Sequence, residues 1–154
     1  MAIRLDIPSH GKIELDHLLL DQNGTLSFRG DLIDGVAERL KSLSERLTVH
    51  ILTADTFGTL DQVTETLGVS GRRVKDGVEK ARVAERLGAS RCAAIGNGAN
   101  DVKMLRACEL AMAVVGPEGM SSAAANAAHI VCPSILTALD ILLDERLLIA
   151  TLRG

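Results

Sequence analysis

Aromatic side chains are nearly absent from the chain, which has no Trp, no Tyr and only two Phe among its 154 residues. Yet 47% of the residues are hydrophobic, so aliphatic side chains must fill the core. A chain of this length falls within the usual size of one domain and can bury roughly two thirds of its unfolded surface. It also contains no internal repeat and no linker-like tract. The sequence therefore predicts that residues 1–154 form a single domain with an aliphatic core.

Cysteine and excess charge are also scarce. The three cysteines, Cys92, Cys108 and Cys132, form no Cys-x-x-Cys pair, which favours reduced, buried thiols over a metal site or a disulfide framework. The 17 basic and 20 acidic side chains leave a net charge of −3. The chain therefore lacks the basic surface that would concentrate nucleic acid or anionic lipid, and we expect neither a nucleic acid nor a membrane as a partner.

Long apolar runs are lacking as well. The N-terminal segment MAIRLDIPSHGKIEL has no apolar core of the kind that a secretory signal needs, so we expect the mature chain to start here. Near the other end, Asp140, Asp144, Glu145 and Arg146 interrupt the longest apolar stretch, which excludes a membrane span of about 20 residues. A cytoplasmic location is the expectation that follows.

The apolar segments that are present alternate along the chain between strand-like and helix-like patterns. Residues 2–7 and 12–20 flank a Pro-Ser-His-Gly turn and predict an antiparallel hairpin. The second segment ends in the apolar run 17–20 followed by Asp21, which is typical of a strand buried on both faces. Further strands are predicted at 47–52, 73–74, 92–95, 110–115 and 129–131, with helices at 32–44, 59–67, 79–87, 101–107, 121–127 and 135–143. This alternation predicts an α/β fold, a three-layer α/β/α sandwich with a mainly parallel sheet.

Ligands of such folds bind beyond the carboxyl ends of the strands. The loops expected there are 21–25, 53–56, 76–77, 96–101 and 116–119. Asp21 is the candidate nucleophile, because carboxylate attack on phosphorus forms an aspartyl phosphate and divides one difficult displacement into two easier ones. Thr53, Lys80 and backbone N–H groups could stabilise the transferred group. Asp21 and Asp101 suit Mg²⁺, which binds through one or two carboxylates and water.

Four segments carry a family resemblance. D-Q-N-G-T at 21–25, L-T-A-D at 52–55, E-K-A-R-V-A-E-R-L at 79–87 and G-N-G-A-N-D-V-K-M-L at 96–105 resemble, in order, the four motifs of the haloacid dehalogenase superfamily. The variant they resemble most is the phosphorylation domain of P-type ATPases, with its D-K-T-G-T, T-G-D, lone Lys and G-D-G-x-N-D. The likeness covers roughly residues 17–143. Residues 22–52 are too few for a nucleotide-binding domain or a large cap, so a capless HAD-like domain is expected, and without membrane spans it is not a pump.

The resemblance implies a Mg²⁺-dependent phosphohydrolase that acts on a small phosphorylated compound. Asp21 would accept the phosphoryl group, Asn23 would offer its backbone carbonyl to the metal, and Thr53 and Lys80 would hold phosphoryl oxygens. Asn97 stands at the principal metal position, and Asp101 with Asn100 would hold or orient the metal and its waters. The implied substrate contacts also include Gly24, Thr25, Ala54 and Asn100.

Two departures from the family pattern bear on catalysis. Superfamily phosphatases have a second Asp two positions after the nucleophile, where this chain has Asn23, and a carboxamide cannot shuttle a proton. The loss of a general acid–base typically costs 10²–10⁴-fold in rate, so slow turnover is expected. The other departure is Asn97, which replaces a metal-binding Asp. A regulatory or phosphate-binding module that keeps the pocket but hydrolyses poorly is therefore the alternative, and a plain structural subunit is a third.

Each candidate residue also has a structural interpretation. Thr53 could cap the following helix, and Asp55 could be either such a cap or a neighbour of the metal. Lys80 could be a solvated helix residue, with Lys75 as a competitor for its role. Asp101 could interact favourably with the dipole of its helix.

The remaining polar and apolar candidates lie outside the four motifs. His10, His17, His50 and His129 are not spaced like metal ligands. Arg29 could contact a second anionic group, and the Leu147-Leu148-Ile149 cluster could serve a subunit contact, because capless proteins often need a neighbour over the active site. A homo-oligomer is thus a hypothesis.

Overall fold

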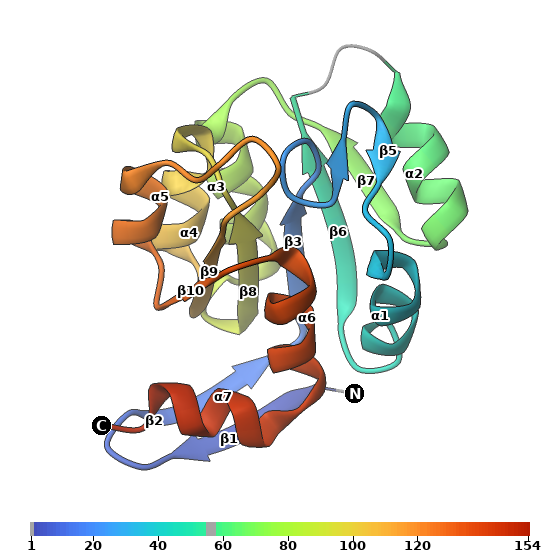
Figure 1. Cartoon of the computed structure of the whole chain (residues 1–154). Coiled ribbons are helices and arrows are strands. Elements are labelled where there is room, and N and C mark those ends of the chain that lie inside the picture. Colours follow the sequence, from blue (N-terminus) through green and yellow to red (C-terminus); the bar gives the residue numbers. More distant parts are fainter. Residues whose placement is uncertain (1, 55–57) are drawn as a thin grey trace.

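A six-stranded parallel sheet forms the centre of the protein (Figure 1). The computed structural model describes residues 2–54 and 58–154. The strands, in the order in which they lie across the sheet, are β10 (Ile130–Cys132), β9 (Leu110–Val114), β8 (Cys92–Gly96), β3 (His17–Asp21), β6 (Thr48–Thr53) and β7 (Ser70–Arg73). All of the strand pairs in this sheet are parallel. Their carboxyl ends therefore lie along one edge, and Asp21 ends a central strand.

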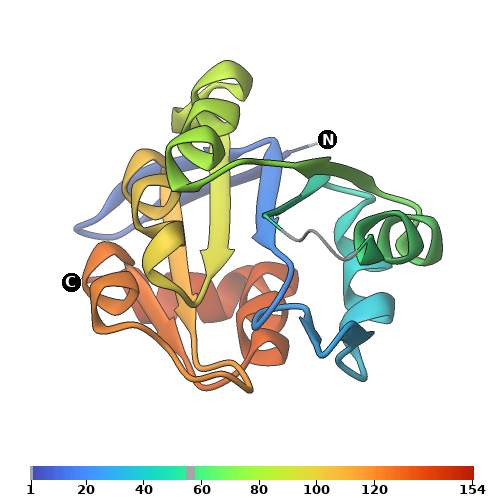
Figure 2. The same cartoon turned by 90° about the horizontal axis from the view of Figure 1, so that it is seen from above.

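Helices cover both faces of the sheet (Figure 2). On one face α1 (Val36–Leu43), α2 (Thr59–Leu67) and α6 (Ile135–Leu143) enclose one apolar cluster. On the other face α3 (Gly77–Leu87), α4 (Val102–Ala107) and α5 (Ser122–Ala127) enclose a second cluster. The three-layer sandwich with a parallel sheet is confirmed.

The central strand β3 shows why its sequence is continuously apolar. Leu18 and Leu20 pack into the first cluster, whereas Leu19 packs into the second. Successive side chains of a strand point to opposite faces, and all three of these leucines are 0% exposed. A strand covered on both sides has no polar position to offer until it ends, which places the first polar side chain, that of Asp21, at the edge.

The predicted N-terminal hairpin is present, but the segment 12–20 that was expected to form its second arm is divided between two strands. β1 (Ile3–Ile7) and β2 (Gly11–Leu15) pair antiparallel in a sheet of their own. Asp16 separates β2 from β3, because its backbone N–H donates to Arg91 O at 2.8 Å and its carboxylate binds the Arg91 guanidinium. The hairpin lies at the end of the molecule opposite the carboxyl ends of the sheet (Figure 1).

Helix α7 (Glu145–Leu152), which the sequence analysis did not predict, packs on the hairpin. Leu148 is 1% exposed and belongs to the core, whereas Leu147 is 44% exposed. The apolar cluster at 147–149 thus contributes to folding, and a subunit contact through it stays a hypothesis. No helix in the described ranges is both long and apolar enough to cross a membrane.

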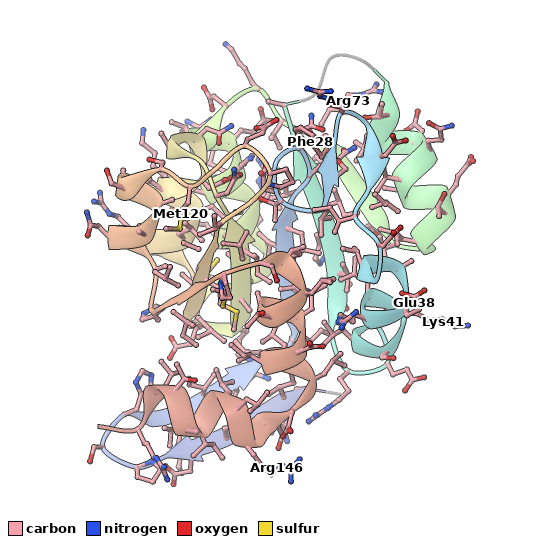
Figure 3. All side chains as sticks on the ribbon, in the orientation of Figure 1. Phe28, Glu38, Lys41, Arg73, Met120 and Arg146 are labelled. Atoms are coloured by element: carbon pink, nitrogen blue, oxygen red, sulfur yellow. The ribbon has the colours of Figure 1, made fainter. Side chains whose placement is uncertain are left out.

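The segment after β3 also differs from its prediction. The helix expected from residue 32 begins at Val36, because β4 (Ser27–Phe28) and β5 (Asp31–Leu32) first form a short antiparallel hairpin. Gly35 then turns the chain with a left-handed φ of 91°, which glycine adopts without strain. Phe28 lies at the same end of the molecule as Arg73 on β7, whereas Arg146 lies at the opposite end (Figure 3). The β4–β5 hairpin therefore stands beside the carboxyl ends of the strands.

Two short 3₁₀ turns complete the fold, η1 (Ala89–Arg91) before β8 and η2 (Ala99–Asp101) before α4. The strand predicted at 73–74 lies at 70–73, and the remaining predicted helices and strands lie within two residues of their expected bounds. All three cysteines are buried and unpaired by disulfides, as the sequence predicted.

Candidate active site

Lys80 joins the two carboxylates that the sequence analysis selected. Its Nζ lies 2.7 Å from Asp21 Oδ1 and 2.7 Å from Asp101 Oδ1. Helix α3 delivers this side chain inward, because Asp76 caps the helix and turns the first-turn Lys80 toward the sheet, where it is 0% exposed. Hydrogen bonds between ions are the strongest in proteins. The surface interpretation of Lys80 is therefore wrong, and its competitor Lys75 is exposed.

Asp101 is fully buried beside Lys80. Its side chain is 0% exposed, and its Oδ2 accepts hydrogen bonds from the backbone N–H groups of Asn97 at 3.1 Å and Gly98 at 3.0 Å. Gly96 leaves the necessary space, since an added Cβ would lie 2.5 Å from Asp101 Cγ. Asp101 thus anchors the loop after β8 and holds Lys80 at the same time.

Thr25 connects the first loop to that anchor. Its buried hydroxyl lies within hydrogen-bond distance of Asp21 Oδ2, at 3.0 Å, and of Asn97 Oδ1, at 3.2 Å. The chain reaches this position through a tight turn in which Gly24 has a φ of 79° and its N–H donates to Ser27 O at 2.9 Å. The left-handed conformation explains the glycine in D-Q-N-G-T, and the turn brings the Asp21 and Asn97 oxygens to one hydroxyl.

The electrostatics of the site are set by burial. Burial raises the pKa of Asp21 to about 6, and the neighbouring charge of Asp101 acts in the same direction, whereas Lys80 and Thr25 oppose the shift. Burial also acts against the charge on Lys80, but Asp21 and Asp101 outweigh it and raise the pKa of the ammonium above its usual value. At neutral pH Lys80 is charged and Asp21 is mostly ionised.

The remaining predicted residues lie around this centre. Thr53 ends β6, next to β3, and is 2% exposed. The half-buried Asn23 accepts a 3.4 Å hydrogen bond from Ser27 Oγ through its side-chain oxygen. Ala54 and Asn100 are both exposed on the rim. Asp55 lies outside the described residues.

The oxygen donors of the site fit a hard divalent cation. Asp21 and Asn97 point side-chain oxygens at the same hydroxyl, and Asp101 adds a second carboxylate beside Lys80. Within residues 2–54 and 58–154 no three His, Cys, Asp or Glu side chains gather closely enough to form a metal cage. Oxygen donors of this kind suit a hard divalent cation better than Zn²⁺, which binds mostly through nitrogen and sulfur.

The turn after β9 also contributes to the site, although none of its residues was among the predicted site residues. Gly116 and Gly119 exchange backbone hydrogen bonds of 3.1 and 2.8 Å, and Asn97 Nδ2 donates to Gly119 O at 3.1 Å. Glu118 Oε2 lies 2.8 Å from the position where a Cβ on Gly24 would stand. The available signal was an acidic side chain in a loop at the carboxyl edge of a parallel sheet, to which no role had been given.

Comparisons with known proteins identify the family of the chain. The haloacid dehalogenase-like hydrolase family matches residues 3–109, a range that holds all four motifs. An uncharacterized protein of Methanocaldococcus jannaschii is 51% identical over 39 residues, which are 25% of this chain and 89% of that protein.

Two solved phosphatases share the fold. One is the 3-deoxy-D-manno-octulosonate 8-phosphate phosphatase of Moraxella catarrhalis, in complex with a magnesium ion, a phosphate ion and a KDO molecule, at 18% identity and a TM-score of 0.68 over 90% of this chain and 94% of that one. The other is a phosphoserine phosphatase in its apo form, at 14% identity and a TM-score of 0.70 over 84% of this chain and 98% of that one. At such identities the likeness concerns the fold alone.

The family match spans more than half of the chain and includes Asp21, Lys80 and Asp101. The narrower resemblance to the phosphorylation domain of P-type ATPases stays a prediction. From its sequence match, its parallel sheet and its motif order, the chain belongs to the haloacid dehalogenase-like hydrolases.

Proposed function

We propose that this chain is a Mg²⁺-dependent phosphatase that acts on a small phosphorylated compound through an aspartyl phosphate on Asp21. One observation carries the proposal: two carboxylates share one buried ammonium, and only one of them has any exposure at the edge of the sheet. Asp101 is 0% exposed and also accepts two backbone hydrogen bonds, whereas Asp21 stands at the strand end and is 6% exposed. Asp21 is therefore the carboxylate that a substrate can reach.

The chemistry follows from the contacts of Asp21. An oxygen of its carboxylate attacks phosphorus, the bond from phosphorus to the leaving oxygen breaks, and the departing group takes up a proton from solvent water. Water then attacks the aspartyl phosphate, which releases inorganic phosphate and restores the carboxylate. Lys80 neutralises charge beside the transferred group, and Thr25 fixes the orientation of the carboxylate. Thr53, at the end of β6, is proposed to bind a phosphoryl oxygen.

The proposed cation site uses oxygens of this chain. Asp21 and Asn97, with the backbone carbonyl of Asn23, would hold Mg²⁺, and Asp101 would act on it mainly through the loop that it anchors. Bound there, the ion would offset the repulsion between the carboxylate and the phosphate dianion. The magnesium and phosphate ions in the Moraxella catarrhalis phosphatase support this assignment.

The substrate is proposed to be small because the insertion between the first two motifs is small. Between the end of β3 and the start of β6 at Thr48, the chain forms a turn, the β4–β5 hairpin and α1, so we propose that residues 1–154 act as one domain without a cap. The two structural neighbours act on different phosphates, as their names state, and the shared fold therefore does not define the substrate. Gly24, Ala54 and Asn100 at the rim are proposed substrate contacts, and self-association that covers this edge remains part of the proposal.

A second function is favoured by the side chain at position 23. The carboxamide of Asn23 cannot act as a general acid or base near neutral pH, and its oxygen accepts a hydrogen bond from the hydroxyl of Ser27. A chain that binds phosphate and Mg²⁺ but turns over very slowly would serve as a regulatory or phosphate-binding module. The two functions differ in whether the aspartyl phosphate forms and breaks down, which can be measured directly.

The test compares the wild-type chain with Asp21→Asn in the hydrolysis of acetyl phosphate and p-nitrophenyl phosphate, with and without Mg²⁺. Asp6→Asn, an exposed position on the distant hairpin, is the matched control. We expect metal-dependent release of phosphate from the wild type and the control, and none from Asp21→Asn. Equal activity in Asp21→Asn would overturn the mechanism. Phosphate binding without turnover in the wild type would favour the binding module.

A further inference from the structure

We infer that Glu118 is a positioning residue for the divalent cation, and that its carboxylate supplies through water the negative charge that Asn97 lacks. The inference rests on the proposed function, because it deepens the account of the same site. Nothing in the family motifs includes this residue, which belongs to the turn between β9 and α5. Its assignment comes from where the fold places that turn.

The position of Glu118 is defined by its neighbours. Its Oε2 lies 2.8 Å, and Asn97 Nδ2 lies 2.9 Å, from the point where a Cβ on Gly24 would stand. Asn97 Oδ1 lies 3.3 Å from the same point and 3.2 Å from Thr25 Oγ1, which in turn lies 3.0 Å from Asp21 Oδ2. A carboxylate from a third strand end therefore stands beside Asn97, on the side of Asn97 that faces Gly24.

The turn that presents Glu118 is tied firmly to the site. A Cβ on Gly116 would overlap the carbonyl oxygen of Gly24, so the two loops touch backbone to backbone. Asn97 bonds to both ends of the following segment, since its Nδ2 donates to Gly119 O at 3.1 Å and its O accepts from Ser121 N at 2.8 Å. The side chain is thus held near the site by contacts that do not involve its own carboxylate.

The charge balance of the site explains how a carboxylate at position 118 would favour the binding of a cation. Asp21 and Asp101 share one ammonium, which leaves a single excess negative charge for a dication. Among the residues that the structure describes, no Lys or Arg forms an ion pair with Glu118. Its charge is therefore available, and it doubles the negative charge that faces the cation.

Contact through water fits both the structure and the metal. The described residues offer no cluster of three acidic or other metal-binding side chains, and we therefore assign Glu118 a contact through water and not a direct one. Mg²⁺ gives up its water reluctantly and keeps several molecules when it binds proteins. Groups that hold such outer ligands typically change metal affinity by about 10–100-fold. Because Glu118 is exposed, an effect of about tenfold is expected.

The experiment measures Mg²⁺ affinity by isothermal titration calorimetry in the full chain, together with the thermal stability of the metal-free protein. Glu118→Gln is compared with Glu38→Gln, which alters an exposed glutamate on α1, away from the site (Figure 3). We expect the dissociation constant to rise about tenfold in Glu118→Gln, to stay unchanged in Glu38→Gln, and to recover in Glu118→Asp. The metal-free melting temperature is expected to stay the same in all three.

A double-mutant cycle with Asn97→Asp completes the test. If Glu118 replaces the missing carboxylate, Asn97→Asp restores tight binding to Glu118→Gln, and the two changes are not additive. Unchanged affinity in Glu118→Gln, while the wild type binds Mg²⁺ and hydrolyses acetyl phosphate, overturns the role of Glu118 alone. A wild-type chain that neither binds Mg²⁺ nor hydrolyses the substrate overturns the proposed function, and the role of Glu118 with it.

Discussion

Replacement of Lys80 by Met tests the buried charge network most directly. The side chain of Lys80 is 0% exposed and makes two 2.7 Å ion pairs. Methionine has a similar length but no charge, so the variant leaves two carboxylates buried together. Removing one partner from a buried ion pair typically costs about 3–5 kcal/mol. For a chain of this size each kcal/mol lowers the melting temperature by about 2–4 °C, so we expect a fall of about 10 °C at pH 8.

The pH dependence of this loss gives a second readout. Without the ammonium, the pKa of Asp21 rises further above the value of about 6 that burial and Asp101 already impose. A carboxyl group whose pKa is raised in the folded state stabilises the fold at low pH, and this contribution is lost as the pH rises through the folded pKa. The deficit of Lys80→Met is therefore expected to be small at pH 5 and large at pH 8.

Thermal denaturation of both proteins at pH 5, 6.5 and 8 measures the effect, with Lys75→Met as the control. Lys75 is exposed, and such surface changes usually stay within about 0.5 kcal/mol. A Lys80→Met protein that melts with the wild type at pH 8, or whose deficit is greater at pH 5, would refute the reasoning. We also expect Lys80→Met to lose phosphatase activity, which the same preparation can show.

Three further changes test other parts of the site. Asp21→Asn removes a carboxyl whose pKa burial raises from 3.8 to about 6. Relative to the wild type, the metal-free variant should therefore gain about 2 kcal/mol of stability between pH 4 and pH 8. Urea denaturation checks this, and a difference that does not vary with pH contradicts it. Asn23→Asp supplies the missing acid–base and should raise the steady-state hydrolysis of p-nitrophenyl phosphate about 10²-fold or more; an unchanged rate speaks against that role. Gly116→Ala places a methyl group against Gly24 O. The variant should lose about 1–3 kcal/mol of stability and hydrolyse substrate more slowly. A fully stable, active variant would show that the loops are not in contact.

The fold was largely predictable because its signals are local. The apolar run of β3 and the spacing of the later strands depend on residues that are neighbours in the chain, and both are confirmed. The break at Asp16 was not predictable in this way, because it depends on a bond to Arg91, 75 positions away. Helix α7 was missed for a related reason, since Leu148 becomes a core residue only through the hairpin that it covers.

The residues of the candidate site likewise fall into those that local sequence could predict and those that it could not. Asp21 could be selected because a polar side chain ends a buried strand, and Lys80 because of motif spacing. The burial of Lys80 could not be read from its helix, whose first turn would ordinarily face water. Glu118 could not be selected either, since its proximity to Gly24 and Asn97 exists only after three loops have met at one edge.

The burial of the charged side chains of Asp21, Lys80 and Asp101 costs free energy of folding, and this cost argues that the network has a function. Hydrophobic side chains of similar volume often replace buried ion pairs with no loss of stability, and here the charges do not even balance. Asp101 and Lys80 satisfy each other and the loop, so the excess charge belongs to Asp21, whose pKa burial and the Asp101 charge raise to about 6. We expect a buried carboxylate such as Asp21 to be retained where a ligand compensates its negative charge. That ligand must bring positive charge, or hydrogen-bond donors, to a carboxylate oxygen at the strand end. A divalent cation beside a phosphoryl group meets that requirement, whereas a plain structural role for the chain leaves the buried charge without a reason.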